Sequence, residues 1–266
     1  MKRAACSLYG FLFVFAVMLC GVAYAQDEGN VVFQTSTINA LMEGGYDGET
    51  TFEELGRHGD FGIGTFNALD GEMIELDGNF YQVKADGVAY PVGGAMKTPF
   101  AEVAFFKSDT ISVLTDSVDL ERLEKYLDGI MPSVNLVYAV KVEGTFGYVR
   151  TRSVARQKPP YPRLVDAVKD QATFEFKDCK GTLVGFRFPD FLKGLNVPGY
   201  HFHFLTSDRK AGGHVLALET GNIKIEAAEL QNFVMTLPEG RPIGGDSSEE
   251  VEKVEKGVTL KQPVDN

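Results

Sequence analysis

Alternating apolar and polar residues predict a chain built mostly from short β-strands. In residues 61–92 the alternating runs are separated three times by Asp-Gly, at 70–71, 77–78 and 86–87. Asp-Gly supplies the positive φ angles of tight hairpin turns, so this segment predicts a β-meander. Beyond residue 171 the alternation resumes and predicts strands at 172–177, 182–188, 200–206, 214–219, 222–228 and 230–237.

Two segments have helical spacing instead. Thr51 is followed three residues later by Glu54, the pattern of a capping box, which predicts a short helix within 51–59. Apolar residues recur at the spacing of one helical face through 118–131, where Gly129 is expected to end the helix. Helices are therefore expected to be few.

A proline-rich segment, 157–163, interrupts the strand pattern and predicts an extended connector. Before it, we expect a pair of strands that meet at Glu143-Gly144. We place a boundary at the connector, between an N-terminal β-rich subdomain (26–160) and a C-terminal one (161–266). The expected fold class is α+β and β-rich, with mixed or antiparallel sheets.

Two segments resemble each other within the chain. Residues 71–83 (GEMIELDGNFYQV) and 213–225 (GHVLALETGNIKI) share a pattern of glycine, apolar and acidic positions, with one residue inserted in the second. The similarity either records a duplication or arises because β-hairpins often look alike. If it is a duplication, Glu72 occupies in the first half the place that His214 occupies in the second.

The first 25 residues read as a secretory signal peptide. Two basic residues precede an apolar run over about 8–22, and Ala-Tyr-Ala at 23–25 forms an A-x-A cleavage site. The run is short for a membrane span of about 20 residues, so a retained anchor is the weaker interpretation. We therefore expect an exported protein, periplasmic or extracellular, that starts at Gln26 and has no membrane partner after cleavage.

Charge and cysteine content narrow the functional classes. The net charge is −11, and loss of Lys2 and Arg3 with the signal peptide would bring it to about −13. Such an acidic chain is repelled by nucleic acid and by anionic membranes, so neither is expected as a partner. Cleavage would also leave Cys179 as the single cysteine, which excludes an internal disulfide.

Three of the four histidines lie in one short stretch, GYHFHFLTSDRKAGGHVL. Residues i and i+2 of a strand share a face, so His201 and His203 project together, and a hairpin can bring His214 beside them. Three imidazoles so arranged leave a coordination position open, as in catalytic zinc sites, although manganese, iron or cobalt also suit such ligands. The alternative is three histidines that pair with carboxylates or hydroxyls.

Arg152 is a candidate for substrate binding. Together with Arg150 it is expected to lie on one face of a strand, and an arginine in a concave site binds a carboxylate through two hydrogen bonds. The alternative is a salt bridge at the rim of an acidic protein. The pattern alone does not choose between these roles.

Three blocks of the chain together resemble the α-acetolactate decarboxylases: FGIGTFNALDGEMIELDGNFYQ, YVRTRSVARQKPPYP and YHFHFLTSDRKAGGHVL. Their order and spacing match that family over Val31 to Glu255. The resemblance implies two similar β-sheet subdomains with few helices that face a central metal site. It also implies a homodimer, and export is known among such proteins.

The resemblance further implies the roles of individual residues. The residues expected to bind Zn²⁺ are His201, His203 and His214. Glu72, Arg152 and a glutamate near the C-terminus are expected to be catalytic, and Arg152 and Thr65 to bind the substrate. Glu255 is the best match for the C-terminal glutamate and Glu252 the second choice, because the segment before them is short and rich in glycine.

The implied reaction converts 2-acetolactate, a 2-hydroxy-3-oxo acid, to acetoin and carbon dioxide. Zinc would stabilise the enediolate, Arg152 would hold the departing carboxylate, and Glu72 or Glu255 would deliver a proton to one face. Two alternatives are a secreted metal-binding module without activity and a cupin-type metalloenzyme with another substrate. Cupins usually place a carboxylate soon after the H-x-H motif, and this chain does not.

Overall fold

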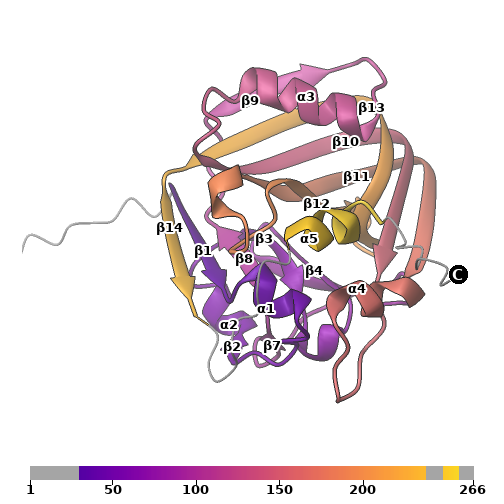
Figure 1. Cartoon of the computed structure of the whole chain (residues 1–266). Helices are drawn as coiled ribbons and strands as arrows, with labels where there is room; N and C mark the ends of the chain where they lie inside the picture. Colours follow the sequence, from indigo (N-terminus) through magenta and orange to yellow (C-terminus); the bar gives the residue numbers. More distant parts are fainter. Residues whose placement is uncertain (1–29, 238–247, 258–266) are drawn as a thin grey trace, which may run out of the picture.

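The structure, a computed structural model, describes residues 30–237 and 248–257, so the predicted signal peptide at 1–25 lies outside the described residues. Two β-sheets contain most of the strands of the described residues (Figure 1). In spatial order the first sheet contains β14 (Asn232–Thr236), β1 (Val31–Thr35), β8 (Ala101–Ala104), β3 (Phe61–Thr65), β4 (Glu72–Leu76), β5 (Asn79–Val83) and β6 (Ala89–Pro91). The second contains β10 (Val137–Ser153), β11 (Ala172–Phe188), β12 (Gly199–Thr206), β13 (Gly212–Leu230) and β9 (Thr110–Leu114).

Smaller elements connect and cover the sheets. A two-stranded sheet consists of β2 (Thr50–Thr51) and β7 (Lys97–Thr98). The α-helices of the described residues are α1 (Ile38–Met42), α2 (Phe52–Leu55), α3 (Leu120–Ile130), α4 (Leu164–Ala167) and α5 (Ser248–Glu255). Single 3₁₀ turns are η2 (Asn67–Leu69), η3 (Val168–Asp170) and η4 (Asp190–Leu192). Across 30–237 and 248–257, no helix is long and apolar enough to cross a membrane.

The predicted β-meander is confirmed. Strands β3, β4, β5 and β6 pair with one another in succession and antiparallel. Asp77 and Gly78 form the turn between β4 and β5, with φ angles of 54° and 70°. These are the positive angles for which Asp-Gly is favoured in two-residue hairpin turns.

Both predicted helices are present. The hydroxyl of Thr51 accepts a hydrogen bond from the backbone N–H of Glu54 at 3.1 Å and so caps α2. Asp119 caps α3 in the same way. Gly129 lies in the last turn of α3 and does not end it, because its backbone keeps a negative φ angle and the helix continues to Ile130.

The expected strand pair at Glu143-Gly144 is wrong, because β10 passes through this point as one strand and pairs with β11 and β13 on its two sides. Its register with β13 shifts just after Gly144. A Cβ atom on Gly144 would lie 2.2 Å from the carbonyl oxygen of Asn222. The glycine therefore permits a bulge, which bends a strand without reversing it. In the same way, β11 and β13 each join two segments that were predicted as separate strands.

The sheets draw on the chain from both sides of the proline-rich connector. Strands β9 and β10 precede it but belong to the second sheet, whereas β14 follows it and joins the first sheet beside β1. The β1–β14 pair is parallel, and the other pairs of the first sheet are antiparallel. The chain therefore crosses between the sheets more than once before it reaches its C-terminal helix.

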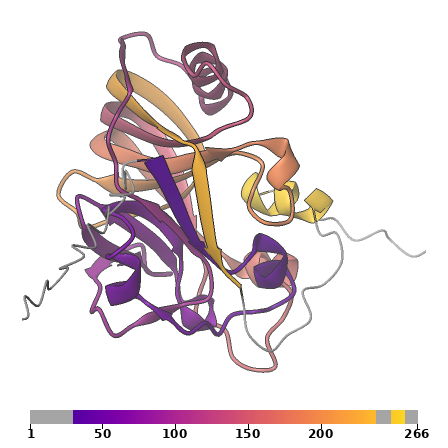
Figure 2. The same ribbon diagram turned by 90° about the vertical axis from the view of Figure 1, so that its left-hand side faces the viewer.

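An apolar core fills the space between the two sheets. It joins Ile63 and Ile74 of the first sheet to Val184 and Phe186 of the second. Figure 2 shows the purple strands of the first sheet below the pink and orange strands of the second. The expected fold class, a β-rich α+β protein with few helices, is confirmed.

The two similar segments of the chain begin alike and then differ. Thr65 lies opposite Glu72 across β3 and β4, just as His203 lies opposite His214 across β12 and β13. The first segment then turns back as the β4–β5 hairpin, whereas the second continues straight through β13. Glu72 and His214 thus hold equivalent places at the starts of their strands, although the two segments do not form equivalent hairpins.

Candidate metal centre

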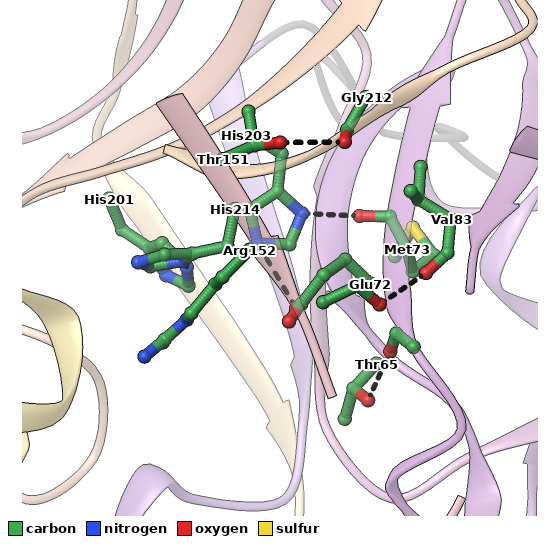
Figure 3. Close-up of polar contacts among 12 residues, drawn as sticks. Thr65, Glu72, Met73, Val83, Thr151, Arg152, His201, His203, Gly212 and His214 are labelled. Atoms are coloured by element: carbon green, nitrogen blue, oxygen red, sulfur yellow. Dashed lines mark hydrogen bonds and ion pairs between the residues drawn. The ribbon is translucent and has the colours of Figure 1, made fainter. Parts of the chain in front are cut away.

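Strands from both sheets bring the predicted site residues to one buried place (Figure 3). His214, at the start of β13, lies directly opposite His203 on β12 and opposite Arg152 on β10. The first sheet contributes Glu72 at the start of β4, and α5 ends at Glu255. Residues far apart in the sequence therefore converge because antiparallel pairing aligns the ends of their strands.

The three histidines form a compact, buried cluster. One ring nitrogen of each lies within 4.8 Å of the others, and Nε2 of His201 is 3.1 Å from Nδ1 of His214. Two ligands of one tetrahedral zinc ion, each at about 2.0–2.1 Å from the metal, are about 3.3 Å apart. The cluster can therefore hold a metal ion.

Hydrogen bonds outside the cluster set the tautomers of two rings. Nδ1 of His203 is 2.8 Å from the carbonyl oxygen of Met73, and Nε2 of His214 is 3.1 Å from the carbonyl oxygen of Glu255. A carbonyl oxygen only accepts, so these two nitrogens carry the protons. The lone pairs are then on Nε2 of His203 and Nδ1 of His214, as coordination of a cation requires.

Burial keeps the imidazoles neutral. Burial and, to a smaller extent, the Arg152 guanidinium lower the pKa of His201 to about 3. The pKa values of His203 and His214 are also well below the usual range, mainly because of burial. Since the neutral ring is the form that binds metals, the cluster is ready to bind a metal at neutral pH.

Glu72 and Glu255 approach the cluster from different elements. Oε2 of Glu72 is 3.6 Å from Nε2 of His203, and Oε2 of Glu255 is 3.6 Å from Nε2 of both His201 and His214. Burial raises the pKa of each carboxyl to about 7, although the nearby arginine opposes the shift. A carboxyl group with a pKa near neutrality is suited to proton transfer at physiological pH.

Of the two C-terminal candidates, the structure places Glu255 at the cluster. Glu252 points to solvent and pairs with Lys256 at 2.7 Å. The helix is held by Val251 and Val254, which are buried against α1 and α4. This anchoring holds the end of α5, and with it Glu255, beside the histidines.

Arg152 is buried, with 4% of its surface exposed. Its Nη1 donates to the carbonyl oxygen of Val254 and, at 3.2 Å, to Oε1 of Gln171. Within the described residues it forms no ion pair with a carboxylate, and its buried Nε has no hydrogen-bond partner. A salt bridge at the rim therefore does not describe it. Arg150, expected on the same face, is exposed instead, because the register with β13 shifts between Arg150 and Thr151.

Thr65 lies beside Glu72 at the lower edge of the site in Figure 3. Its hydroxyl donates a hydrogen bond to the carbonyl oxygen of Gly71 at 2.7 Å and is buried. Because the hydroxyl proton is engaged, this oxygen can only accept a hydrogen bond from a ligand.

A cavity of about 790 Å³ reaches the cluster between α3, α5 and the start of β12. His201, His214 and Glu255 contribute to its wall, and Glu124 and Lys193 are among the residues farther out. This volume suits a small molecule.

Sequence reasoning missed the partners that surround these residues. Gln171 and the backbone of Val254 contact Arg152, and Glu102 on β8 lies 3.8 Å from His201. A signal for Glu102 was available, because it is a single acidic residue in the apolar run PFAEVAFF. No comparable signal marks Gln171, which directly precedes β11 and reaches Arg152 because β11 pairs with β10.

Fold and site together define a β-rich protein with a buried three-histidine metal-binding centre, flanked by two carboxyl groups and an arginine. Comparison with known families gives the class a name. The family model described as alpha-acetolactate decarboxylase matches residues 32–242, and the chain belongs to this family.

Individual relatives agree with the family match. The alpha-acetolactate decarboxylase of Methanosarcina mazei is 51% identical over 239 residues, which cover 87% of this chain and 82% of that protein. That of Bacillus licheniformis is 45% identical over 207 residues, or 78% and 82% of the two chains. The crystal structure of alpha-acetolactate decarboxylase from Bacillus subtilis strain 168 matches with a TM-score of 0.83 and 36% identity, covering 85% of this chain and 99% of that one.

Proposed function

We propose that this chain is a metal-dependent acetolactate decarboxylase, which converts 2-acetolactate to acetoin and carbon dioxide. The observation that carries the proposal is the convergence of Arg152, Glu72 and Glu255 on a three-histidine cluster in a member of this family. The relatives named above carry the name of this activity.

Zinc is the metal that we propose for the cluster. Three neutral imidazoles suit it, and Nε2 of His203 is buried without a hydrogen-bond partner among the described residues. When bound, the ion would supply a Lewis acid that stabilises the negative charge of the enediolate left by departing carbon dioxide. No organic cofactor is then required.

Arg152 is proposed to hold the substrate carboxylate. Its hydrogen-bond partners in the described residues are a neutral amide and a backbone carbonyl, so its positive charge remains available to an anion. In the reaction the bond between the carboxylate carbon and C2 breaks, and its electron pair stays on the substrate. Fixing the carboxylate orients this bond for cleavage.

Glu72 or Glu255 is proposed to return a proton to C2. Both carboxyls lie at the cluster and have pKa values of about 7, so each can be protonated at neutral pH. They approach from different elements, β4 and α5, and a donor on one side gives a single stereoisomer of acetoin. The Thr65 oxygen is proposed as a hydrogen-bond acceptor for the substrate.

Export and dimerisation are proposed for the whole chain. The basic start, the apolar run and the A-x-A site support a cleaved signal peptide over residues 1–25. A homodimer is supported by the resemblance to the family, and light scattering on the purified protein measures it.

The activity is tested by giving racemic acetolactate to the purified protein and following acetoin and carbon dioxide. We expect acetoin to form faster than the spontaneous background, to stop after treatment with a chelator and to return with Zn²⁺. Manganese and cobalt added in parallel identify the preferred metal. Tight metal binding without acetoin formation would favour the inactive metal-binding module. Acetoin formation that a chelator leaves unchanged would overturn the role of the metal.

A further inference from the structure

A buried carboxyl group of the first sheet faces the histidine cluster from behind. Glu102 lies on β8, between β1 and β3, and none of its surface is exposed. Alternation along the strand puts it on the same face as Ala104, which packs in the core between the two sheets. Its Oε1 is 3.8 Å from Nδ1 of His201.

Neither group has a well-formed hydrogen bond, although the side chain of Asn196 interacts with Glu102. Neither oxygen of Glu102 forms a hydrogen bond within the described part of the chain, and neither does Nδ1 of His201. No lysine or arginine of residues 30–237 and 248–257 forms an ion pair with Glu102. A buried polar group without a partner is costly, by about 1–3 kcal/mol or more for a charged group, so such groups usually have a role.

The other two histidines show what is missing at His201. His203 donates to the carbonyl oxygen of Met73, and His214 donates to that of Glu255. Each ring is thereby held with its lone pair free for a metal. Among the described residues, His201 has no such acceptor except Glu102. The 3.8 Å between Nδ1 of His201 and Oε1 of Glu102 is about 1 Å longer than a typical N–H···O hydrogen bond. Because the terminal torsion of a glutamate is soft, a small rotation closes this gap.

We propose that Glu102 is a positioning residue for the metal centre. Its carboxyl group accepts a hydrogen bond from Nδ1–H of His201 and fixes the tautomer whose Nε2 faces the metal. The inference rests on the metal binding in the proposed function, but not on the identity of the substrate.

The test compares Glu102→Leu with Glu75→Leu, because leucine removes the hydrogen-bond acceptor that glutamine would keep. Glu75 is a matched control, because it is equally buried and also lacks hydrogen-bond partners, yet it lies on β4 on the opposite face from Glu72. Zinc affinity is measured by competition with a chromophoric chelator. We expect Glu102→Leu to weaken zinc binding about 10- to 100-fold, and Glu75→Leu to change it less than about threefold. The visible spectrum of the cobalt-substituted protein should change only in Glu102→Leu.

A measurement on the unaltered protein covers the case in which Glu102→Leu does not fold. In the zinc-loaded protein with ¹⁵N-labelled histidine, we expect His201 and His203 to be coordinated through Nε2 and His214 through Nδ1. The Nδ1–H proton of His201 should exchange slowly with water. Coordination of His201 through Nδ1 would overturn the proposal.

Two other results would also overturn it: equal zinc affinity in Glu102→Leu and the parent, or an equal loss in Glu75→Leu. A parent protein that binds no metal would have the same consequence. Failure of the decarboxylase assay is a separate result, because metal affinity is measured without substrate. A protein that binds zinc through this arrangement but forms no acetoin would refute the proposed function alone.

Discussion

At the scale of single residues, metal binding and turnover should separate by substitution. We expect His203→Ala to lose the bound metal, because it removes a buried ring whose lone pair faces the cluster. Arg152→Ala should keep the metal but lose turnover by about 100-fold or more, because the carboxylate is no longer oriented. Metal content by mass spectrometry and acetoin formation measure the two effects.

Controls for these variants come from residues of the same type outside the site. His58 lies on the surface and pairs with Glu54, and Arg150 is exposed on the same strand as Arg152. Alanine at either position should leave both metal content and turnover within about twofold of the parent. Full turnover in His203→Ala or in Arg152→Ala would contradict the role assigned to that residue.

Glu75 should make stability depend on pH. Burial raises its pKa from 4.5 to about 9. Between these values the native protein keeps this proton and the unfolded chain does not, so the free energy of unfolding falls as the pH rises. The stabilisation that protonated Glu75 contributes is complete below pH 4.5 and is lost progressively toward pH 9. We expect Glu75→Gln to flatten the fall between pH 5 and 8 by up to about 1.4 kcal/mol per pH unit.

Urea unfolding at a series of pH values measures this slope. Glu53→Gln on α2 is the control, since that side chain is exposed. A slope in Glu75→Gln that equals the parent's would show that Glu75 is ionised in the native protein.

The sequence predicts individual site residues only where chemistry concentrates locally. His201, His203 and His214 stand out because they share one short stretch, and the family resemblance points to Glu72, Arg152 and Glu255. Glu102 could not be assigned to His201, because their strands lie in different sheets and meet only in the folded core. Contacts across the core depend on how the two sheets stack. The spacing of residues along the sequence carries no information about this stacking.

At the scale of elements, the site depends on how α5 is attached. Arg163, just before α4, pairs with Glu43 at 2.7 Å and with Glu250 on α5 at 2.6 Å. Val251 and Val254 bury the apolar face of the helix. One ion pair to α5, one small apolar face and the hydrogen bonds from Arg152 and His214 to its backbone thus hold the element that ends at the cluster.

Removal of the ion pairs should loosen α5. We expect Arg163→Gln to speed amide hydrogen exchange in α5 up to about tenfold, since half-exposed ion pairs contribute about 0.2–1 kcal/mol each. Turnover should fall by less than about tenfold, with the metal content unchanged, because the histidines lie on strands. Hydrogen exchange followed by mass spectrometry, with acetoin assays, checks both.

Arg57→Gln is the matched control. Arg57 also forms two ion pairs, with Glu53 and Glu54, but it links only residues of its own helical segment. Exchange in α5 should not change in this variant. Unchanged exchange in Arg163→Gln as well would show that the ion pairs do not hold α5, and that its apolar face and its backbone hydrogen bonds to Arg152 and His214 are sufficient.

Local elements were predictable and long strands were not. The Asp77-Gly78 turn and the Thr51 cap depend on neighbouring residues, so their patterns predict them correctly. Gly144 has the same local signature as a turn, but β13 pairs with residues on either side of it and keeps β10 one continuous, bent strand. Whether a glycine makes a turn or a bulge is decided by a partner strand about 80 residues away.

At the scale of the whole molecule, the site joins the two sheets. The hydrogen bond from His203 to Met73 crosses from the second sheet to the first, and Arg152 contacts the backbone of α5. The return of β14 to pair with β1 brings the chain back past the first sheet before α5 begins. These long-range pairings follow from the packing of the complete chain, so alternation along the sequence indicated the fold class but not the strand order.

Processing of the N-terminus is the prediction that belongs to the complete chain. Cleavage after Ala25 would leave the described fold intact, since that begins at Asn30 and its first strand at Val31. We expect the exported protein to start at Gln26 and to remain soluble outside the cytoplasm, because its net charge of about −13 disfavours binding to anionic membranes. Intact mass of the protein from the periplasm or medium measures this.

Ala25→Arg serves as the matched variant for processing, because signal cleavage requires a small residue at that position. It should keep residues 1–25 and accumulate in the membrane fraction, while the fold from β1 onward is unchanged. With Cys6 and Cys20 removed, the processed protein retains only Cys179, so its melting temperature should be the same with and without reductant. An exported protein that still carries residues 1–25 would contradict cleavage, because the apolar run would then act as an anchor.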